Sequence, residues 1–343
     1  MPAGYTAPRA ADEVTRPLAP EVRRTYSVCC PPSPGTTLRV GVRQVVGGEF
    51  STYAVKELAV GDLLDVMAPT GRFVLPPQPG HFAAVVGGSG ITPVLSMATT
   101  LLAEEPSARF TLVRSDRSSD SAMFLEEVAE LKDRYPDRFH LVHVLTREEL
   151  QAGPVSGRLD EARLTTLLPA LLTVSAVDGW YLCGPLGLVR SSTSALLGLG
   201  VPRHLVHQEI FHAEETDTDP ATGRATDTDT TGAPSRENRG APSSTPAPST
   251  PLDATLTGTL HGRSGTWSSG RSETVLETVL RHRPDAPYAC RGGVCGTCRA
   301  LLVDGEVHMA RDFALEPGEV SAGYVLTCQS RPVTAHVEVD FDR

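Results

Sequence analysis

The middle of the chain alternates between short apolar runs and segments with a helical pattern of apolar positions. The apolar runs are His81–Val86, Arg109–Arg114, Phe139–Leu145, Trp180–Cys183 and His204–Phe211. Between two of them, Ser121–Arg134 places its apolar residues on one side of a helix. Alternation of this kind is typical of a parallel β-sheet with helices on both faces. The pattern therefore predicts an α/β domain over residues 80–212.

The regions on either side of this α/β pattern predict two further kinds of structure. Arg24–Phe73 reads as short strands rich in Gly, Pro and Val, which favours antiparallel pairing and part of a β-barrel. Towards the other end, Ala254–Leu260 predicts a strand and Thr274–Leu280 a short helix. We therefore expect a multidomain protein with a partial antiparallel β-barrel, an α/β parallel-sheet domain and an α+β domain.

A stretch without apolar side chains separates the last two regions. From Ala213 to Pro251 the chain has no Val, Ile, Leu, Met or aromatic residue; it repeats Thr-Asp and then becomes rich in Pro, Ser and Thr. Such a sequence cannot bury enough apolar surface to offset the entropy lost on ordering. We expect a disordered linker at 213–251, which leaves domains at 1–79, 80–212 and 252–343.

Charge and composition narrow the classes of function. The net charge is −10, whereas surfaces that bind nucleic acid need clustered basic residues. No apolar run approaches the roughly 20 residues of a membrane span, and the first twenty residues lack the apolar core of a secretory signal. We expect a cytoplasmic protein with neither nucleic acid nor a membrane as its partner.

Four of the seven cysteines fall in one constellation: Cys290, Cys295, Cys298 and Cys328. The first three have the spacing C-x4-C-x2-C, and the glycines between them let the backbone wrap closely and bring amide N–H groups to the sulfurs. A structural zinc site is the alternative, but such sites usually use paired C-x2-C knuckles. The spacing predicts a [2Fe–2S] cluster held by these four cysteines.

Two glycine-containing loops follow predicted strands of the α/β region. Gly87-Gly88-Ser89-Gly90-Ile91-Thr92-Pro93 lies between a strand and a helix, where glycines let the backbone approach a pyrophosphate and the helix N-terminus favours its charge. Cys183-Gly184-Pro185 follows a later strand. Because ligands bind at the carboxyl ends of parallel strands, we expect both loops at one crevice. For the first loop, a tight turn without a ligand is the alternative.

The cysteine motif resembles that of a known family. Cys290-Arg-Gly-Gly-Val-Cys-Gly-Thr-Cys, together with Tyr324–Pro332, resembles the plant-type ferredoxin domain, and the resemblance covers residues 252–343. It implies an α+β fold of the β-grasp type. Plant-type clusters have reduction potentials of about −400 mV, so the domain is expected to supply low-potential electrons to another protein.

Arg24-Thr25-Tyr26-Ser27, taken with the two glycine-containing loops, resembles the ferredoxin–NADP reductase superfamily. The resemblance implies that nicotinamide meets flavin at Thr92 and that Cys183 and Phe211 hold catalytic positions near the flavin ring. A plain core aromatic is the alternative for Phe211. The residues implied to hold FAD are Arg24, Tyr26, Ser27, Gly48 and Ser51.

Arg117 bears on the choice of nucleotide. It follows the second predicted strand of the α/β region, where the 2′-phosphate of NADPH would lie. An arginine there can pair with the phosphate, although a solvated loop charge is the alternative. We expect NADPH, with NADH possible.

The order of the three expected domains explains how electrons would move. NAD(P)H delivers two electrons as a hydride and a cluster takes one at a time, so a flavin must stand between them. The whole chain most resembles the reductase subunits of phenylacetyl-CoA epoxidases, whose partner is a diiron oxygenase in phenylacetate breakdown. The likeness lies in Val113–Glu126, Leu131–Arg147, Trp180–Pro185 and Asp285–Ala300.

Other interpretations of the function stay open. Reductases of 3-ketosteroid 9α-hydroxylases and of other Rieske ring-hydroxylating oxygenases share this domain order. A ferredoxin-like carrier on a degenerate flavoprotein belongs to a different class, and a flavin absorption spectrum would distinguish it. Family members carry further residues ahead of the region that matches Gly4–Ser27, so we also expect a flavin barrel that is incomplete at its N-terminus.

Overall fold

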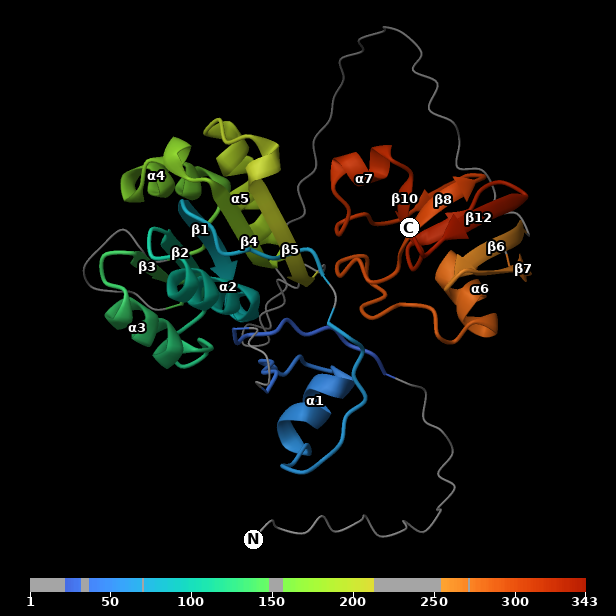
Figure 1. The fold of residues 1–343 in the computed structure, drawn as a ribbon, viewed down its shortest axis with the longest axis horizontal. Coiled ribbons are helices and arrows are strands. Elements are labelled where there is room, and N and C mark those ends of the chain that lie inside the picture. The colour runs from blue at the N-terminus through green and yellow to red at the C-terminus, as the bar shows by residue number, and fades with distance from the viewer. Residues whose placement is uncertain (1–21, 32–36, 70, 148–156, 213–253, 271) are drawn as a thin grey trace, which may run out of the picture.

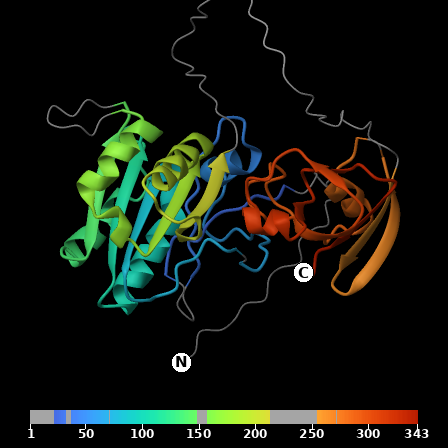
Figure 2. The same cartoon turned by 90° about the horizontal axis from the view of Figure 1, so that it is seen from above.

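The structure is a computed structural model that describes residues 22–31, 37–69, 71–147, 157–212, 254–270 and 272–343. Figure 1 and Figure 2 show its N-terminal segment (22–79), its central part (80–212) and its C-terminal part (254–343) from two sides. The expected linker at 213–251 and the expected incompleteness ahead of residue 22 lie outside the described residues. The domain boundaries therefore stay predictions.

The central part is built on a five-stranded sheet whose strands all run parallel. Their order is β3-β2-β1-β4-β5, so the direction of winding reverses between β1 and β4. The carboxyl ends of these two neighbouring strands open the crevice where ligands bind in such sheets. Each strand coincides with a predicted apolar run, which confirms the parallel-sheet prediction. The bounds are β1 (His81–Gly87), β2 (Arg109–Asp116), β3 (Phe139–Leu145), β4 (Gly179–Pro185) and β5 (Val206–His212).

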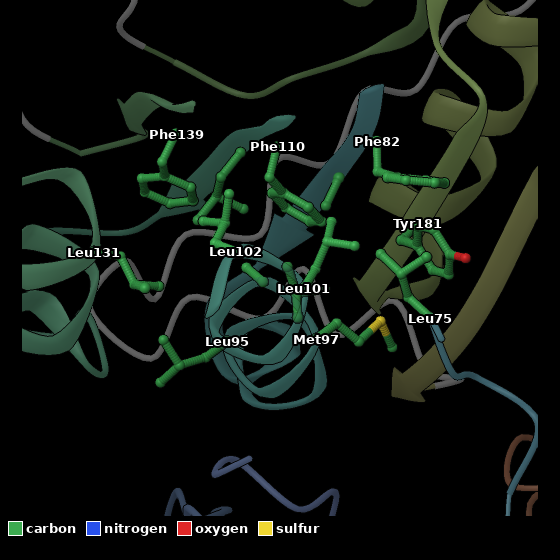
Figure 3. Packing of buried hydrophobic residues seen from close by; sticks show 14 of the residues in the cluster. Leu75, Phe82, Leu95, Met97, Leu101, Leu102, Phe110, Leu131, Phe139 and Tyr181 are labelled. Atoms are coloured by element: carbon green, nitrogen blue, oxygen red, sulfur yellow. The ribbon is translucent and has the colours of Figure 1, made fainter. Parts of the chain in front are cut away.

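Helices cover both faces of this sheet (Figure 1). The helices are α2 (Ile91–Glu104), α3 (Leu125–Arg134), α4 (Glu161–Leu171) and α5 (Leu186–Gly198). Apolar side chains of α2 and α3 pack on one face, and those of α4 and α5 on the other. Figure 3 shows the first of these layers, where Leu101 and Leu102 lie against Phe110. Among the described helices, none is long and apolar enough to cross a membrane.

The helix α3 begins later than the sequence predicts. The apolar pattern places its start at Ser121, but Phe124 has a φ of 57° and interrupts the helical backbone there. A left-handed residue of this kind cannot continue a right-handed helix. The apolar side of α3 is nevertheless the predicted one, because Val128 and Leu131 are its buried residues.

The N-terminal segment contains less regular structure than the sequence predicts. Its described residues form one antiparallel bridge, Val28–Val40, where several strands were expected. They also form a helix that was not predicted, α1 (Glu49–Lys56). Its first-turn glutamate and last-turn lysine suit the helix dipole. Each strand of a closed barrel pairs with a neighbour on both sides. Beyond the one bridge, the described residues of this segment do not pair in that way, and its apolar Val46 and Leu63 are 101% and 96% exposed.

The C-terminal part is an α+β fold, as predicted. Its five-stranded mixed sheet has the order β10-β8-β12-β6-β7, and a second small sheet pairs β11 with β9. The predicted strand at 254–260 and the predicted helix at 274–280 both form. The bounds are β6 (Ala254–Leu260), β7 (Arg263–Ser269), α6 (Val275–His282), β8 (Arg299–Asp304), β9 (Val307–Met309), α7 (Pro317–Ser321), β10 (Tyr324–Leu326), β11 (Ser330–Pro332) and β12 (His336–Asp340).

Candidate functional site

The four predicted cluster cysteines come together in the C-terminal part. Cys290 lies close enough to Cys295 for the two thiols to shift each other's pKa, and the same holds for Cys298 and Cys328. Two sulfurs for each of two irons is the ligand count of a [2Fe–2S] cluster.

The surroundings of these sulfurs suit thiolate ligands. In each pair the neighbouring thiol lowers the pKa of one cysteine, Cys295 or Cys328, and raises the pKa of the other, Cys290 or Cys298. Two donors also point at sulfur: the Gly292 N–H lies 3.3 Å from Cys290 Sγ, and the side-chain amide of Gln329 lies 3.5 Å from Cys328 Sγ. Such donors stabilise thiolates and tune the potential of a bound cluster.

The two glycine-containing loops of the central part touch through their backbones. A Cβ placed on Gly90 would lie 2.2 Å from the carbonyl oxygen of Cys183, and one on Gly184 would lie 2.9 Å from backbone atoms of Gly87. Gly88, in the 3₁₀ turn η1 (Gly88–Gly90), has a φ of 55°. Only glycine fits such close approach. The two loops therefore lie side by side at the carboxyl ends of β1 and β4, where the nucleotide crevice was expected.

Glu209 joins the N-terminal segment to this crevice. Ser27 Oγ donates to Glu209 Oε2 over 3.2 Å, and Cys183 Sγ lies 3.9 Å from the same oxygen. The β4–β5 register brings Cys183 and Glu209 side by side. Cys183 is fully buried, and burial raises the pKa of its thiol, which therefore stays protonated. In the sequence Glu209 is only one residue of the predicted apolar run His204–Phe211, because its partners become visible only when the strands pair.

The pKa of Glu209 gives a testable pH dependence. Burial raises this pKa from 4.5 to about 7. The folded protein therefore holds a proton that the unfolded chain releases, so stability from this group falls as pH rises from about 4.5 to 7. We expect the Tm of the wild type to fall more steeply across this window than that of Glu209→Gln. Parallel curves from thermal unfolding at pH 5, 6, 7 and 8 would contradict this assignment.

The residues predicted to hold FAD lie in two stretches of the N-terminal segment that meet at an aromatic contact. The ring centroids of Tyr26 and Phe50 are 5.5 Å apart. Ser51 Oγ accepts from the Val45 N–H at 3.1 Å and lies 3.3 Å from the Gly48 carbonyl, which fixes the turn before α1. Gly48 supplies no side-chain cap, so the first N–H groups of α1 suit an external acceptor such as a phosphate.

Three other predicted residues are directed elsewhere in this structure. Arg24 is exposed, and its guanidinium donates to the Arg23 carbonyl over 2.7 Å. Thr92 is buried and donates to the Ser89 carbonyl within its own loop over 2.9 Å. Phe211 packs against the core on the α2–α3 face. Their roles toward flavin and nicotinamide stay predictions.

Two arginines lie near the glycine loop of β1. Arg117 is exposed and follows Asp116, whose buried carboxylate accepts from Arg114 Nε at 2.7 Å and fixes the end of β2. Arg43 comes from the N-terminal segment: its guanidinium would lie 2.7 Å from a Cβ on Gly88. Burial lowers the pKa of Arg43, and the nearby Arg117 lowers it further. Arg43 escaped sequence reasoning because nothing in its own strand-like stretch points to a phosphate.

This geometry defines a class of protein: pyridine-nucleotide oxidoreductases that carry a [2Fe–2S] domain on the same chain. Residues 85–194 match the family model "Oxidoreductase NAD-binding domain", and residues 259–333 match "2Fe-2S iron-sulfur cluster binding domain".

Relatives over nearly the whole length narrow the class. The chain is 35% identical over 326 residues to a subunit of the 1,2-phenylacetyl-CoA epoxidase of Escherichia coli (strain K12), covering 94% of this chain and 84% of that protein. It therefore belongs to the family of oxygenase reductase components that join an NAD-binding oxidoreductase domain to a C-terminal [2Fe–2S] domain, and its cofactors include the cluster and NAD(P)H. It is also 33% identical to "3-ketosteroid-9-alpha-monooxygenase, ferredoxin reductase component" of Mycobacterium tuberculosis (strain CDC 1551 / Oshkosh), covering 94% of this chain and 80% of that protein.

Two solved structures match this chain over more than nine tenths of its length. An intact type IV self-sufficient cytochrome P450 monooxygenase matches with a TM-score of 0.61 and 26% identity, over 93% of this chain and 35% of that chain. Phthalate dioxygenase reductase, titled a modular structure for electron transfer from pyridine nucleotides to [2Fe–2S], matches with a TM-score of 0.52 and 24% identity. That match covers 93% of this chain and 83% of the reductase, and it supports the fold.

Proposed function

We propose that this protein passes electrons from NADPH through FAD and its [2Fe–2S] cluster to a partner oxygenase. The observation that carries the proposal is the meeting of three parts of the chain at Glu209. Ser27 donates to its carboxylate and Cys183 lies against it. Burial, and to a lesser degree the nearby Cys295 of the cluster site, raises its pKa. The parts proposed to hold the flavin and the cluster therefore meet at one carboxylate, as electron transfer between the two groups would require.

Each part has a binding role in this proposal. Residues 1–79 hold FAD through Arg24, Tyr26, Ser27, Gly48 and Ser51. Residues 80–212 hold the nucleotide in the crevice formed by the loops at 87–93 and 183–185, and residues 252–343 hold the cluster. When bound, the flavin supplies hydride acceptance and single-electron release. Glu209 binds or releases a proton near neutral pH beside Ser27 and Cys183, so the chain itself can move the proton that accompanies a hydride.

We propose that the partner oxygenase consists of the diiron subunits of a phenylacetyl-CoA epoxidase. The support is the 35% identity to a component of that enzyme over 94% of this chain. Mixed with such subunits, phenylacetyl-CoA and NADPH, the protein should support NADPH consumption that depends on both oxygen and the thioester. If NADPH consumption were the same with and without phenylacetyl-CoA, the proposed partner would be wrong, whereas the proposed reductase function would still stand.

A ketosteroid oxygenase is the second candidate partner. The support is the 33% identity to the reductase component of 3-ketosteroid-9-alpha-monooxygenase over 94% of this chain. The same assay with the oxygenase component of that system and a 3-ketosteroid separates the two candidates. Oxygen-dependent turnover with the steroid, and none with the thioester, would replace the first proposal by the second.

The nucleotide preference rests on Arg117. In Arg117→Ala we expect the KM for NADPH to rise roughly tenfold or more, because a charge-assisted pair contributes about 1.5–3 kcal/mol. The KM for NADH should stay nearly unchanged, since NADH has no 2′-phosphate. Steady-state ferricyanide reduction with each nucleotide measures both values. Equal effects on the two nucleotides would rule out this role for Arg117.

Arg43→Ala is the matched comparison for that experiment. Its guanidinium lies over Gly88, in the loop proposed to hold the pyrophosphate that both nucleotides share. The KM values for NADPH and NADH should therefore rise together. An effect confined to NADPH would move Arg43 to the 2′-phosphate instead.

A further inference from the structure

The first turn of α7 is tied to the rest of the protein by two arginines. Arg72, from the N-terminal segment, pairs with Glu319 and donates to the Ala314 carbonyl over 3.0 Å. Arg203, just ahead of β5, pairs with Glu316 over 2.8 Å. Figure 1 shows α7 on the side of the C-terminal part that faces β5. We call the stretch Asp312–Glu319 the docking segment.

Glu319 and Arg203 are each held in place by contacts within their own part of the chain. Glu319 is only 17% exposed; it also accepts from Arg299 at 3.2 Å and from the Glu316 N–H at 3.0 Å. Although burial opposes it, the hydrogen bond from Arg72 keeps the pKa of Glu319 below its ordinary value. Arg203 is likewise fixed by donating to the Val206 carbonyl over 2.6 Å. Fixed charges of this kind lose little side-chain entropy on pairing and are screened less than mobile surface pairs.

Apolar contacts continue the same interface to the cluster ligands. Phe313 and Val294 pack against the core on the α4–α5 face of the central sheet, and Arg190 lies 5.4 Å above the Phe313 ring. Val294 immediately precedes Cys295. Leu315 is buried in one cluster with Cys298 and Cys328. Because Leu315 belongs to the docking segment and packs with two of the cluster cysteines, a shift of this segment would also move the cluster loop.

We propose that Arg72 and Arg203 are positioning residues, which seat the docking segment so that the cluster loop lies at the flavin site for internal electron transfer. This rests on the function proposed above. The reductant is NADPH and the oxidant in the test is cytochrome c. Two cytochromes are reduced for each hydride, one electron at a time, and the proton is left to solvent. In this structure the docking segment is covered by the N-terminal segment and the central part. It therefore contacts the chain's own reductase part and not an external partner.

The test is reversal of charge across each pair. Arg72→Glu and Glu319→Arg should each slow flavin-to-cluster electron transfer about tenfold, the size of coupling that contacting charges show. The double variant should recover most of that loss. Ferricyanide reduction, which needs only the flavin, should stay near wild type throughout. Stopped-flow absorption of the reconstituted protein measures both steps, and Arg134→Glu, an exposed arginine on the distant helix α3, is the control.

Hydrogen exchange supplies a readout that does not depend on turnover. Peptides covering 312–321 should exchange faster in each single variant and return toward wild type in the double variant. Because Glu319 also caps α7, the Arg203→Glu and Glu316→Arg pair is tested in parallel. Single variants with normal transfer rates, or double variants no better than singles in both pairs, would overturn the positioning role. Absence of cytochrome c reduction in the wild type would instead overturn the proposed function itself.

Discussion

Replacing Cys298 by serine should remove the visible absorption of the cluster and stop electron delivery to cytochrome c. Cys298 is 3% exposed and supplies one of four thiolates, and the harder oxygen of serine is a poor substitute for sulfur on iron. Loss of outer-shell partners alone reduces metal affinity or activity by about 10–100-fold, and loss of a ligand should exceed that. Reduction of cytochrome c should therefore fall to the background of the flavin.

Ferricyanide reduction separates loss of the cluster from general damage. It takes electrons from the flavin, so it should survive in Cys298→Ser. Cys30→Ser is the matched control, because Cys30 lies outside the cluster loop and its thiol only approaches the Thr37 carbonyl at 3.7 Å. That variant should keep both activities. Loss of ferricyanide reduction from Cys298→Ser, with the flavin still bound, would contradict the proposed order of electron carriers.

Gly90→Ala should impair nucleotide binding severely. The added methyl group would lie 2.2 Å from the carbonyl oxygen and 2.5 Å from the carbonyl carbon of Cys183, so backbone must move. Overpacking of this kind destabilises by about 1–3 kcal/mol. Separation of the two loops should also raise the KM for both NADPH and NADH by roughly tenfold, since about 1.4 kcal/mol corresponds to that factor. Fluorescence titration and thermal unfolding measure the two effects.

A second glycine provides the control for this substitution. Gly198 ends α5, and a Cβ placed there would meet nothing within 4 Å. Gly198→Ala should bind nucleotide normally and gain roughly 0.5–1 kcal/mol of stability, because alanine suits a helix better than glycine. Normal nucleotide binding by Gly90→Ala would show that contact between the loops is not required.

The sequence predicted the central and C-terminal parts because their elements are locally encoded. Buried parallel strands read as continuous apolar runs, and all five runs became strands. The short helix predicted from Thr274 also forms, and in the structure Thr274 and Glu277 make a capping box at the start of α6. The cysteine loop was predictable for a related reason, since three of its ligands lie within nine residues.

The parts of the site that sequence reasoning missed depend on contacts between distant segments. Glu209 gains its meaning from Ser27, 182 positions earlier, and from its register with Cys183. Arg43 and Arg72 reach across to other parts of the chain from stretches with no motif. The N-terminal segment was predicted least well, because its apolar residues gave a strand pattern whose pairing depends on neighbours.

The position of β12 constrains the order in which the parts of this protein fold. His336–Asp340 is the last strand of its sheet in sequence, yet it lies in the middle, paired in parallel with β6 and antiparallel with β8. A growing chain that stops before His336 leaves two halves of the sheet without their shared neighbour. The sheet of the central part, in contrast, grows outward from its first strand and is complete at His212. On the ribosome we therefore expect the nucleotide-binding part to fold early. The cysteine loop emerges before the sheet that supports it is complete, so we expect iron–sulfur assembly to follow synthesis of the last strand.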